Sequence, residues 1–337
     1  MAVSHHDLNR FRLQADPAAD EPVRAFFAAG RASEVYEVLR RKPEQLMHQT
    51  DELSVFLRST RGQPAWLDAK KMRTAQALFK AHTAAIMGVL GAFSLPFCYA
   101  AAPGNKALYL SDKMRKAPGK RLMDTAQFVQ EVCQPATPEA FIFAINRTRL
   151  IHAIARWHLH SHGWNMQWGE PINQEDMAGT NLAFSYLVLL GLQQSGILLT
   201  PFEKESFLHL WRYIGFQLHI DEALLPDSFA AARTLTTHIR ARNLQHSPEG
   251  AALAQELILF YQSLTGAKDV RAIEAQLAWY LGREVSGYLG IRISPNIYRF
   301  VDLVQQTNVL ARLLGRALPG LDQFSKLKSA MPKNQAA

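Results

Sequence analysis

The chain has 337 residues, of which 48% are hydrophobic and 20% charged, with 19 Gly and 16 Pro. These proportions exclude a disordered, a collagen-like or a disulfide-scaffold protein and leave one large or two ordinary globular domains. The net charge of +8 favours anionic partners such as phospholipid, nucleic acid or a carboxylated cofactor. The two cysteines lack the CxxC spacing, and the first residues lack the basic and apolar regions of a signal peptide, so we expect a cytoplasmic protein.

Apolar residues recur at three- and four-residue spacing between Pro, Gly, Asp and Asn, a pattern that predicts an all-α, multi-helix bundle. The predicted helices span residues 20–40, 44–60, 68–95, 121–133, 138–162, 174–194, 201–218, 227–243, 247–264, 268–287 and 298–316. We expect an N-terminal helical extension over 1–66, a main domain over 67–316 and a loose tail over 317–337.

One long stretch is unusually apolar. No charged residue occurs from Ala81 to Asn105, which is long enough for a membrane span. Pro96 interrupts the stretch and several glycines dilute it, so a helix buried inside protein is the preferred interpretation for residues 84–102. The basic residues that follow predict a solvated loop, with contact to a membrane surface as the alternative. They are Lys106, Lys113, Arg115, Lys116, Lys120 and Arg121.

Several catalytic signatures are missing from the sequence. Gly119-Lys120 lacks the earlier glycine of a phosphate loop, and no GxGxxG or HExxH occurs. Glu205 and His209 are four residues apart, not the three of a di-iron bundle. A clustered Asp pair for magnesium is absent too. An apolar helical protein without these motifs is expected to use an organic cofactor.

The helix predicted over 138–162 carries an inward histidine. Thr137 as N-cap and Pro138 at the first helical position mark its start. Because an α-helix turns by about 100° per residue, six residues of this segment, including the histidine, fall on one face of the helix. They are Phe141, Ile145, Thr148, His152, Ala155 and Leu159. Such a histidine is either a hydrogen-bonded core residue or a ligand.

Two arginines lie one turn either side of this histidine. Arg149 and Arg156 could meet the carboxylates at the edge of a planar cofactor that His152 holds through its imidazole. An Fe–His bond flanked by Arg–propionate pairs would have this geometry. The alternatives are surface ion pairs or bonds to backbone carbonyls.

A cluster of histidines and tryptophans follows. His158, His160 and His162 alternate, so they do not share one helix face and are interpreted as surface residues at the helix end. Half of the tryptophans, Trp157, Trp164 and Trp168, indicate a closed core and not a surface for stacking bases. We therefore expect no nucleic-acid partner.

Short segments in a particular order suggest a family. They are Arg121-Leu122-Met123-Asp124-Thr125-Ala126-Gln127-Phe128, Arg149-Leu150-Ile151-His152-Ala153, Pro171-Ile172-Asn173-Gln174-Glu175-Asp176-Met177-Ala178-Gly179-Thr180, Phe184, Trp211-Arg212-Tyr213-Ile214-Gly215, Ile220-Asp221 and Leu225-Pro226. With them, residues 70–316 resemble the MpaB-like and latex-clearing-protein (rubber oxygenase) haem proteins. From the residues themselves, Asn173 is an N-cap, and Trp211 and Arg212 are interpreted as packing and ion-pair residues.

The resemblance implies a globin-like helical core around a b-type haem. It makes His152 the proximal iron ligand and Arg149 the arginine of an R-x-x-H motif. It makes Arg121 and Thr125 the distal pair that polarises dioxygen. These two are four residues apart, so they share a helix face with Phe128.

The sequence departs from the rubber-cleaving members at three places. Asp124 precedes Thr125 where those proteins have lysine, and no Glu occurs from Ala100 to Leu110, where they have a proposed base. Both departures argue against cleavage of polyisoprene itself. His219 stands where the related pattern has glycine, and we expect a surface or core role for it.

The sequence therefore predicts a haem b-dependent oxygenase that attacks C=C bonds of an apolar, isoprenoid-like substrate with dioxygen. One alternative is a haem-binding sensor or carrier without turnover. Another is a membrane-peripheral interaction protein that has no cofactor. The sequence leaves the oligomeric state open.

Overall fold

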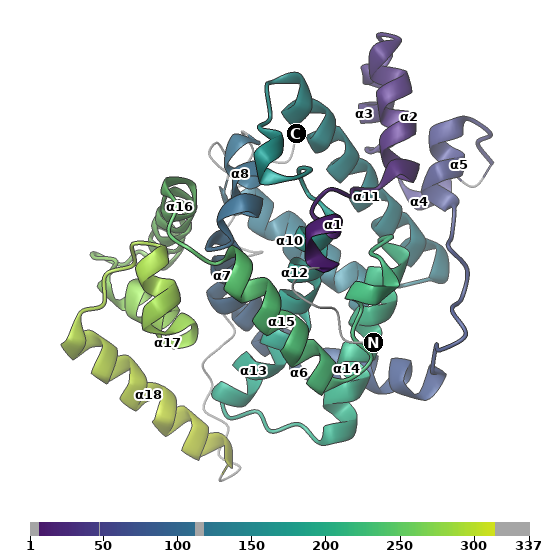
Figure 1. Cartoon of the computed structure of the whole chain (residues 1–337). Helices are drawn as coiled ribbons and strands as arrows, with labels where there is room; N and C mark the ends of the chain where they lie inside the picture. The colour runs from purple at the N-terminus through teal and green to yellow at the C-terminus, as the bar shows by residue number, and fades with distance from the viewer. Residues whose placement is uncertain (1–6, 47, 112–117, 314–337) are drawn as a thin grey trace. The chain divides into compact units, whose positions relative to one another are not determined.

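The computed structural model describes residues 7–46, 48–111 and 118–313, and these form helices and connecting loops (Figure 1). The first half contains α1 (Asp7–Phe11), α2 (Pro17–Ala28), α3 (Ala32–Val38), α4 (Pro43–Leu46), α5 (Glu52–Arg58), α6 (Ala69–Val89), a π-helix (Leu90–Ser94), α7 (Leu95–Tyr99), α8 (Ala102–Leu110), α10 (Pro118–Cys133) and α11 (Pro138–Ser161). The second half contains α12 (Gln174–Phe184), α13 (Tyr186–Gln194), α14 (Pro201–Gln217), α15 (Phe229–Asn243), α16 (Pro248–Thr265), α17 (Arg271–Tyr288) and α18 (Pro295–Leu313). Within these ranges no strand is present, which confirms the predicted all-α fold.

The chain divides into two compact units, each assembled from three segments. The first unit takes the described residues of 1–76, 124–181 and 205–239, and the second takes those of 77–123, 182–204 and 240–337. Because these segments alternate along the chain, neither unit is a continuous stretch of sequence. The predicted boundary between residues 66 and 67 stays a prediction.

In the first unit, α11 is the central helix, and α2 and α5 lie against it. Side chains at three-residue and four-residue spacing on α2 pack against the middle of α11. The buried members of this cluster include Ala19, Val23, Phe26, Leu150, Ala153 and Ile154. Each large apolar side chain buried in this way stabilises the fold by roughly 1.5–3 kcal/mol. The middle of α11 is thereby fixed in place.

In the second unit, the apolar stretch around the π-helix is largely buried. Ile86, Leu90 and Tyr99 are almost fully covered by protein. Gly191 of α13 approaches it so closely that an added Cβ would lie 2.4 Å from a methyl group of Val89. The span Ala69–Tyr99 is long and apolar enough to cross a membrane, but 44% of its most apolar window is buried and a core helix meets the same criterion. The close packing agrees with the preferred interpretation.

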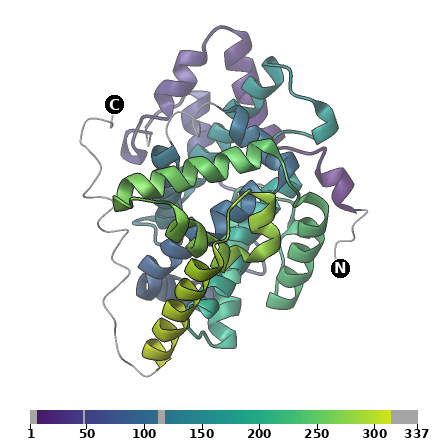
Figure 2. The same cartoon turned by 90° about the vertical axis from the view of Figure 1, so that its left-hand side faces the viewer.

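The C-terminal part of the second unit ends in a helical pair. Figure 2 shows α17 and α18 side by side. Ala275 and Trp279 of α17 form a small buried cluster with Val301 of α18. Trp279 also donates its indole N–H to Asp302, at 3.0 Å, which fixes the register of the two helices.

Five helices predicted as continuous are interrupted in the structure; those over 68–95 and 268–287 contain a non-helical residue, His82 and Gly282 respectively. The helix expected over 20–40 breaks at Gly30, whose φ of +73° is a left-handed conformation that glycine adopts readily. The helix expected over 44–60 is divided into α4 and α5, and that over 174–194 is interrupted at Ser185. These breaks are local turns, so the apolar pattern continues across them.

The prediction of a solvated loop for the basic residues after residue 105 is wrong for Lys106, and also for Lys120 and Arg121, which lie in α10. Lys106 lies in α8, an unpredicted helix, and its Nζ is 2.8 Å from Oε1 of Glu249. Both side chains of this pair are mostly buried. Lys113, Arg115 and Lys116 lie outside the described residues.

Candidate functional site

The predicted histidine helix is present with the expected start. Thr137 accepts a hydrogen bond from the backbone N–H of Ala140 at 3.1 Å, and Pro138 occupies the first helical position. The helix continues to Ser161, so it is long enough to place His152 well inside the first unit. Only part of the His152 side chain is exposed.

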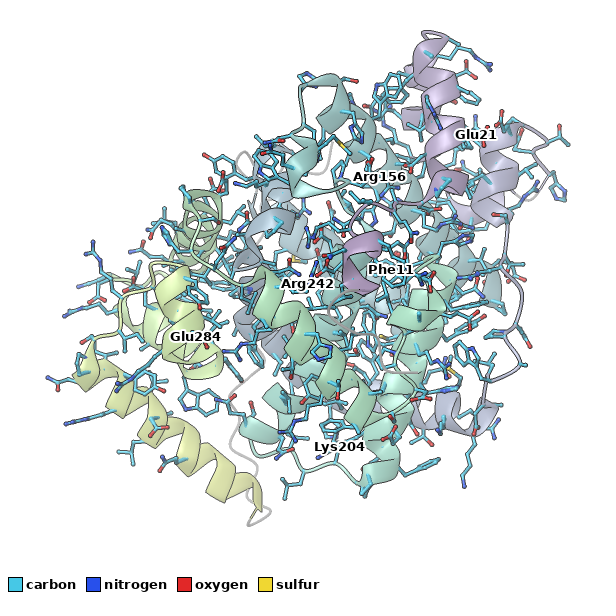
Figure 3. All side chains as sticks on the ribbon, viewed as in Figure 1. Phe11, Glu21, Arg156, Lys204, Arg242 and Glu284 are labelled. Atoms are coloured by element: carbon cyan, nitrogen blue, oxygen red, sulfur yellow. The ribbon has the colours of Figure 1, made fainter. Side chains whose placement is uncertain are left out.

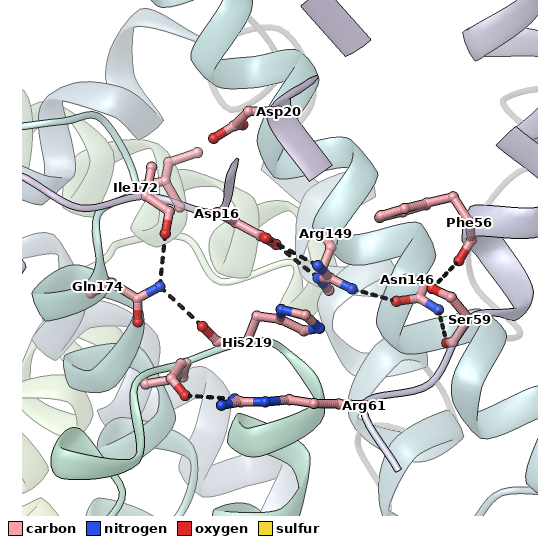
Figure 4. A network of polar contacts seen from close by, with 12 residues as sticks. Asp16, Asp20, Phe56, Ser59, Arg61, Asn146, Arg149, Ile172, Gln174 and His219 are labelled. Carbon is pink, nitrogen blue, oxygen red and sulfur yellow. Dashed lines mark hydrogen bonds and ion pairs between the residues drawn. The ribbon is translucent and has the colours of Figure 1, made fainter. Parts of the chain in front are cut away.

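Arg149 is held by a carboxylate from a distant part of the chain. Its Nε and Nη2 donate to the two carboxylate oxygens of Asp16 at 2.8 and 3.0 Å (Figure 4). Its Nη1 donates to Asn146, one turn earlier on α11, at 2.9 Å. The side chains of Arg149 and Asp16 are 3% and 10% exposed, so this is a buried, two-pronged ion pair.

Arg156 is held in a similar way by Asp20. Its Nε donates to Oδ1 of Asp20 at 2.7 Å, and its Nη1 donates to the carbonyl oxygen of Ile172 at 3.3 Å. Its Nη2 is buried and has no hydrogen-bond partner among the described residues. Figure 3 shows Arg156 in the same region of the first unit as Phe11. The two N–H groups of Arg156 Nη2 are therefore available to an additional acceptor.

The two aspartates respond differently to burial. Burial raises the pKa of a carboxyl group, but the hydrogen bonds and the charge of Arg149 outweigh this effect and lower the pKa of Asp16. For Asp20, burial outweighs the attraction of Arg156, and the pKa is raised. Asp16 is therefore the more firmly ionised partner of the two.

His152, Arg149 and Arg156 line one small cavity, so the structure brings these three predicted residues together. The cavity has a volume of about 10 Å³, enough for a single water molecule. Its lining comes from the N-terminal segment, from α11, from the residues around α12 and from the residue after α14. The lining residues are Ala15, Asp16, Arg149, His152, Arg156, Ile172, Gln174, Met177 and Leu218.

The N-terminal segment is fastened beside this cavity by backbone contacts. Gln174 is the central residue: its side-chain amide donates to the carbonyls of Ala15 at 2.8 Å and of His219 at 3.0 Å. Its side-chain oxygen accepts from the backbone N–H of Asp221 at 2.8 Å. Its backbone N–H donates to the carbonyl of Gln14 at 2.8 Å. One buried glutamine thus connects three parts of the chain.

Two further acidic residues, Glu175 and Asp176, follow Gln174 in the sequence. Glu175 is fully buried and accepts from Arg12 at 3.1 Å, while Asp176 is 3.4 Å from the same guanidinium. Burial raises the pKa of Asp176 to about 6 in spite of Arg12. Asn173 caps the helix by accepting from the backbone N–H of Asp176 at 2.9 Å, which confirms its predicted role.

His219 occupies a position that suits glycine. Its φ is +61°, in the left-handed region where a side chain is strained. Its ring lies beside the Asp16–Arg149 pair (Figure 4). Burial and the positive charge of Arg149 lower its pKa to about 4, so the ring is neutral at neutral pH. This backbone conformation explains why a related sequence pattern would have glycine here.

Arg121 and Thr125 lie one turn apart on α10, and both are partly buried. Neither is among the residues that line the His152 cavity. The boundary between the two compact units falls between them, so their placement toward His152 stays a prediction.

The three histidines at the end of α11 each have a hydrogen-bond partner. His158 bonds to Tyr36 at 2.8 Å and His160 to Glu170 at 2.9 Å, while His162 bonds to the carbonyl of His158 at 2.7 Å. Three different partners fit the predicted helix-end roles. In the described part of the chain, no group of three or more His, Cys, Asp or Glu side chains could hold a metal ion.

The predicted packing role is observed for Trp211, which is buried, and Arg212 lies over the ring of Trp66 at 4.0 Å. Arg212 thus makes a cation–π contact with an aromatic ring, and the ion pair expected for it stays a prediction.

The sequence interpretation missed Asp16 and Asp20. They are four residues apart at the start of α2, so they face the same direction, as Arg149 and Arg156 do two turns apart on α11. Matching the two acids to the two arginines required knowledge that α2 packs on α11. The spacing of the acids was the available signal, but many solvent-exposed helices have the same spacing.

The arrangement defines an all-α protein with an inward histidine between two buried arginines. A sequence profile of the family described as "ER-bound oxygenase mpaB/B'/Rubber oxygenase, catalytic domain" matches residues 44–319. The chain belongs to this family, as its resemblance predicted.

Individual relatives agree with this assignment. The chain is 24% identical over 257 residues to the "Rubber oxygenase" of Streptomyces sp. (strain K30), covering 74% of this chain but only 63% of that protein. A solved structure, "Structure of Latex Clearing Protein LCP in the closed state", has a TM-score of 0.75 at 22% identity, covering 94% of this chain and 88% of the other. The second similarity shows a shared fold.

Proposed function

We propose that the protein is a haem b-dependent oxygenase that adds dioxygen across C=C bonds of an apolar, isoprenoid-like substrate. The observation that carries the proposal is the cavity in which the imidazole of His152 and the unpartnered Nη2 of Arg156 occur together. Membership in an oxygenase family supports the reaction class.

The donor set fits a haem. A haem needs only one protein ligand to its iron, and the imidazole of a histidine such as His152 is a common one. Its carboxylates need charge-assisted donors, and Nη2 of Arg156 is a buried donor that lacks an acceptor. The cavity is of water size, much smaller than a haem, so the segments that line it, and not only side chains such as Met177 and Leu218, would have to move apart.

When bound, haem supplies the site at which dioxygen reacts. His152 would hold the iron, and Arg156 would orient the ring through one carboxylate. Arg121 and Thr125 would donate hydrogen bonds to the reacting oxygen molecule, and the apolar face of α10 would exclude water. Cleavage of one C=C bond by one dioxygen molecule gives two carbonyl groups, one oxygen atom on each carbon, so the overall reaction needs no added reductant.

The first test is an absorption spectrum of the purified protein with a pyridine haemochrome assay. We expect one haem b per chain, and we expect His152→Ala to lose it. His158→Ala is the matched control, because His158 lies on the same helix but is exposed. Wild-type protein without haem after expression with a haem precursor would refute the proposal, and full haem content in His152→Ala would refute the ligand assignment.

Turnover needs a second test, because no Glu occurs from Ala100 to Leu110, where the rubber-cleaving members have a proposed base, and this favours a haem-binding protein without turnover as the competing function. We expect the reduced, haem-loaded protein to consume oxygen only when an isoprenoid such as squalene is added. Haem binding without any such consumption would support the competing function.

A further inference from the structure

The first unit contains a much larger cavity, which no step of the proposed reaction uses. It has a volume of about 670 Å³ and lies where α4, α5, α6, α10, α11 and α14 meet the loop after α5. Cavities of a few hundred to 1,000 Å³ hold drug-sized ligands. We refer to it as the α11 chamber, because the first residues of α11 form much of its wall.

We infer that the α11 chamber binds one apolar small molecule that has a neutral hydrogen-bonding end. Its inner wall is apolar: Leu57 and Val132 are buried there. Phe141 stacks on Tyr213 with ring centroids 5.5 Å apart and an interplanar angle of 8°, which makes a rigid, flat aromatic surface. Such a surface gains favourable contact with a ligand at little cost in side-chain entropy.

The polar groups at the chamber favour a neutral ligand end. One cation and one anion, Arg58 and Glu139, contribute to the lining, so their charges offset one another. The guanidinium of Arg58 already donates to the carbonyls of Leu46 and Gln49, each at 2.7 Å. The side-chain amides of Gln63 and Gln76, which can both donate and accept, suit a hydroxyl or carbonyl group.

The chamber is separate from the His152 cavity. The two sites share no lining residue. Phe141 and His152 are eleven residues apart on one helix, which corresponds to roughly 16 Å along its axis at about 1.5 Å per residue. Binding in the chamber therefore requires neither the imidazole of His152 nor a cofactor, and it goes beyond the proposed function.

The test is isothermal titration calorimetry with farnesol as the probe, on wild-type protein and two variants. Ile142→Trp places a larger side chain in the chamber, and Ile151→Trp is the matched control on the same helix, because Ile151 lines neither cavity. We expect wild-type protein and Ile151→Trp to bind farnesol alike and Ile142→Trp to bind it about tenfold more weakly or not at all. Equal binding by all three, or no binding by wild-type protein, would overturn the inference.

A second variant and a second probe cover the remaining outcomes. Gln76→Glu adds a negative charge to the chamber without changing its size, so it tests the site even if Ile142→Trp does not fold. We expect weaker farnesol binding by this variant. We also expect farnesyl diphosphate to bind wild-type protein more weakly than farnesol, and equal or tighter binding would overturn the neutral-end assignment.

The same titration separates this inference from the proposed function. His152→Ala should lose haem but keep its affinity for farnesol, because His152 is not part of the chamber. A protein that binds farnesol but never haem would refute the proposed function alone. A haem-containing protein that never binds farnesol would refute the chamber alone.

Discussion

Replacement of Asp16 by alanine should be among the most destabilising single changes in the first unit. The change removes both acceptors of Arg149 Nε and Nη2 and leaves a guanidinium that is only 3% exposed. Removing one partner of a buried ion pair typically costs about 3–5 kcal/mol, because the remaining charge is not compensated. A typical domain has a total stability of about 5–15 kcal/mol, so this loss would be a large fraction of it.

The assay is urea unfolding at pH 7, followed by circular dichroism. Arg271→Ala is the control: it breaks a pair of the same length, 2.8 Å to Asp269, in which the side chains are 62% and 51% exposed, and it leaves the backbone hydrogen bond to Asp269 in place. We expect no measurable shift of its urea midpoint, because exposed pairs contribute little. The double variant Asp16→Leu with Arg149→Met should recover much of the loss, because it removes both charges together.

The pH dependence provides an independent check of the same pair. Because the pKa of Asp16 is lowered in the folded protein, its stabilising effect is present above the ordinary pKa of 3.8 and is lost as the pH falls through the lowered value. The difference in unfolding free energy between wild-type protein and Asp16→Ala should therefore shrink only in strong acid. A midpoint for Asp16→Ala equal to that of wild-type protein at pH 7 would refute the buried-pair argument.

Three further changes test other parts of the structure. In urea titrations, the unfolding free energy of Asp176→Asn relative to wild-type protein should rise by about 3 kcal/mol as the pH is raised from 4 to 7, because burial raises the Asp176 pKa to about 6 and the ionised carboxylate opposes folding. A difference that does not change with pH would contradict this. His219→Gly should relieve backbone strain of about 1–2 kcal/mol. It should also lose less stability than wild-type protein between pH 6.5 and pH 4, where the unfolded chain protonates its imidazole and the folded His219 stays neutral; unchanged acid sensitivity would argue against a buried neutral ring. Gly191→Ala should destabilise the second unit by about 1–3 kcal/mol, because the added Cβ would clash with the side chain of Val89. Thermal unfolding measures this loss, and an unchanged melting temperature would mean that α13 shifts easily.

The sequence alone determined the all-α class, the start of α11 and the inward direction of His152. These features depend on local rules: the repeat of apolar residues, the capping by Thr137 and the position of Pro138 act within one or two helical turns. The family resemblance had the same basis, since its short segments are contiguous in the chain.

Only the tertiary structure decided which groups meet the two arginines. The sequence identified Arg149 and Arg156 as anion partners, but it did not show that Asp16 and Asp20, more than 100 residues away, lie opposite them. The α11 chamber also combines residues from six helices and could not be read from any one of them. Contacts between distant segments depend on how helices pack, and packing depends on the shape of whole surfaces, which the local periodicity of a sequence does not specify.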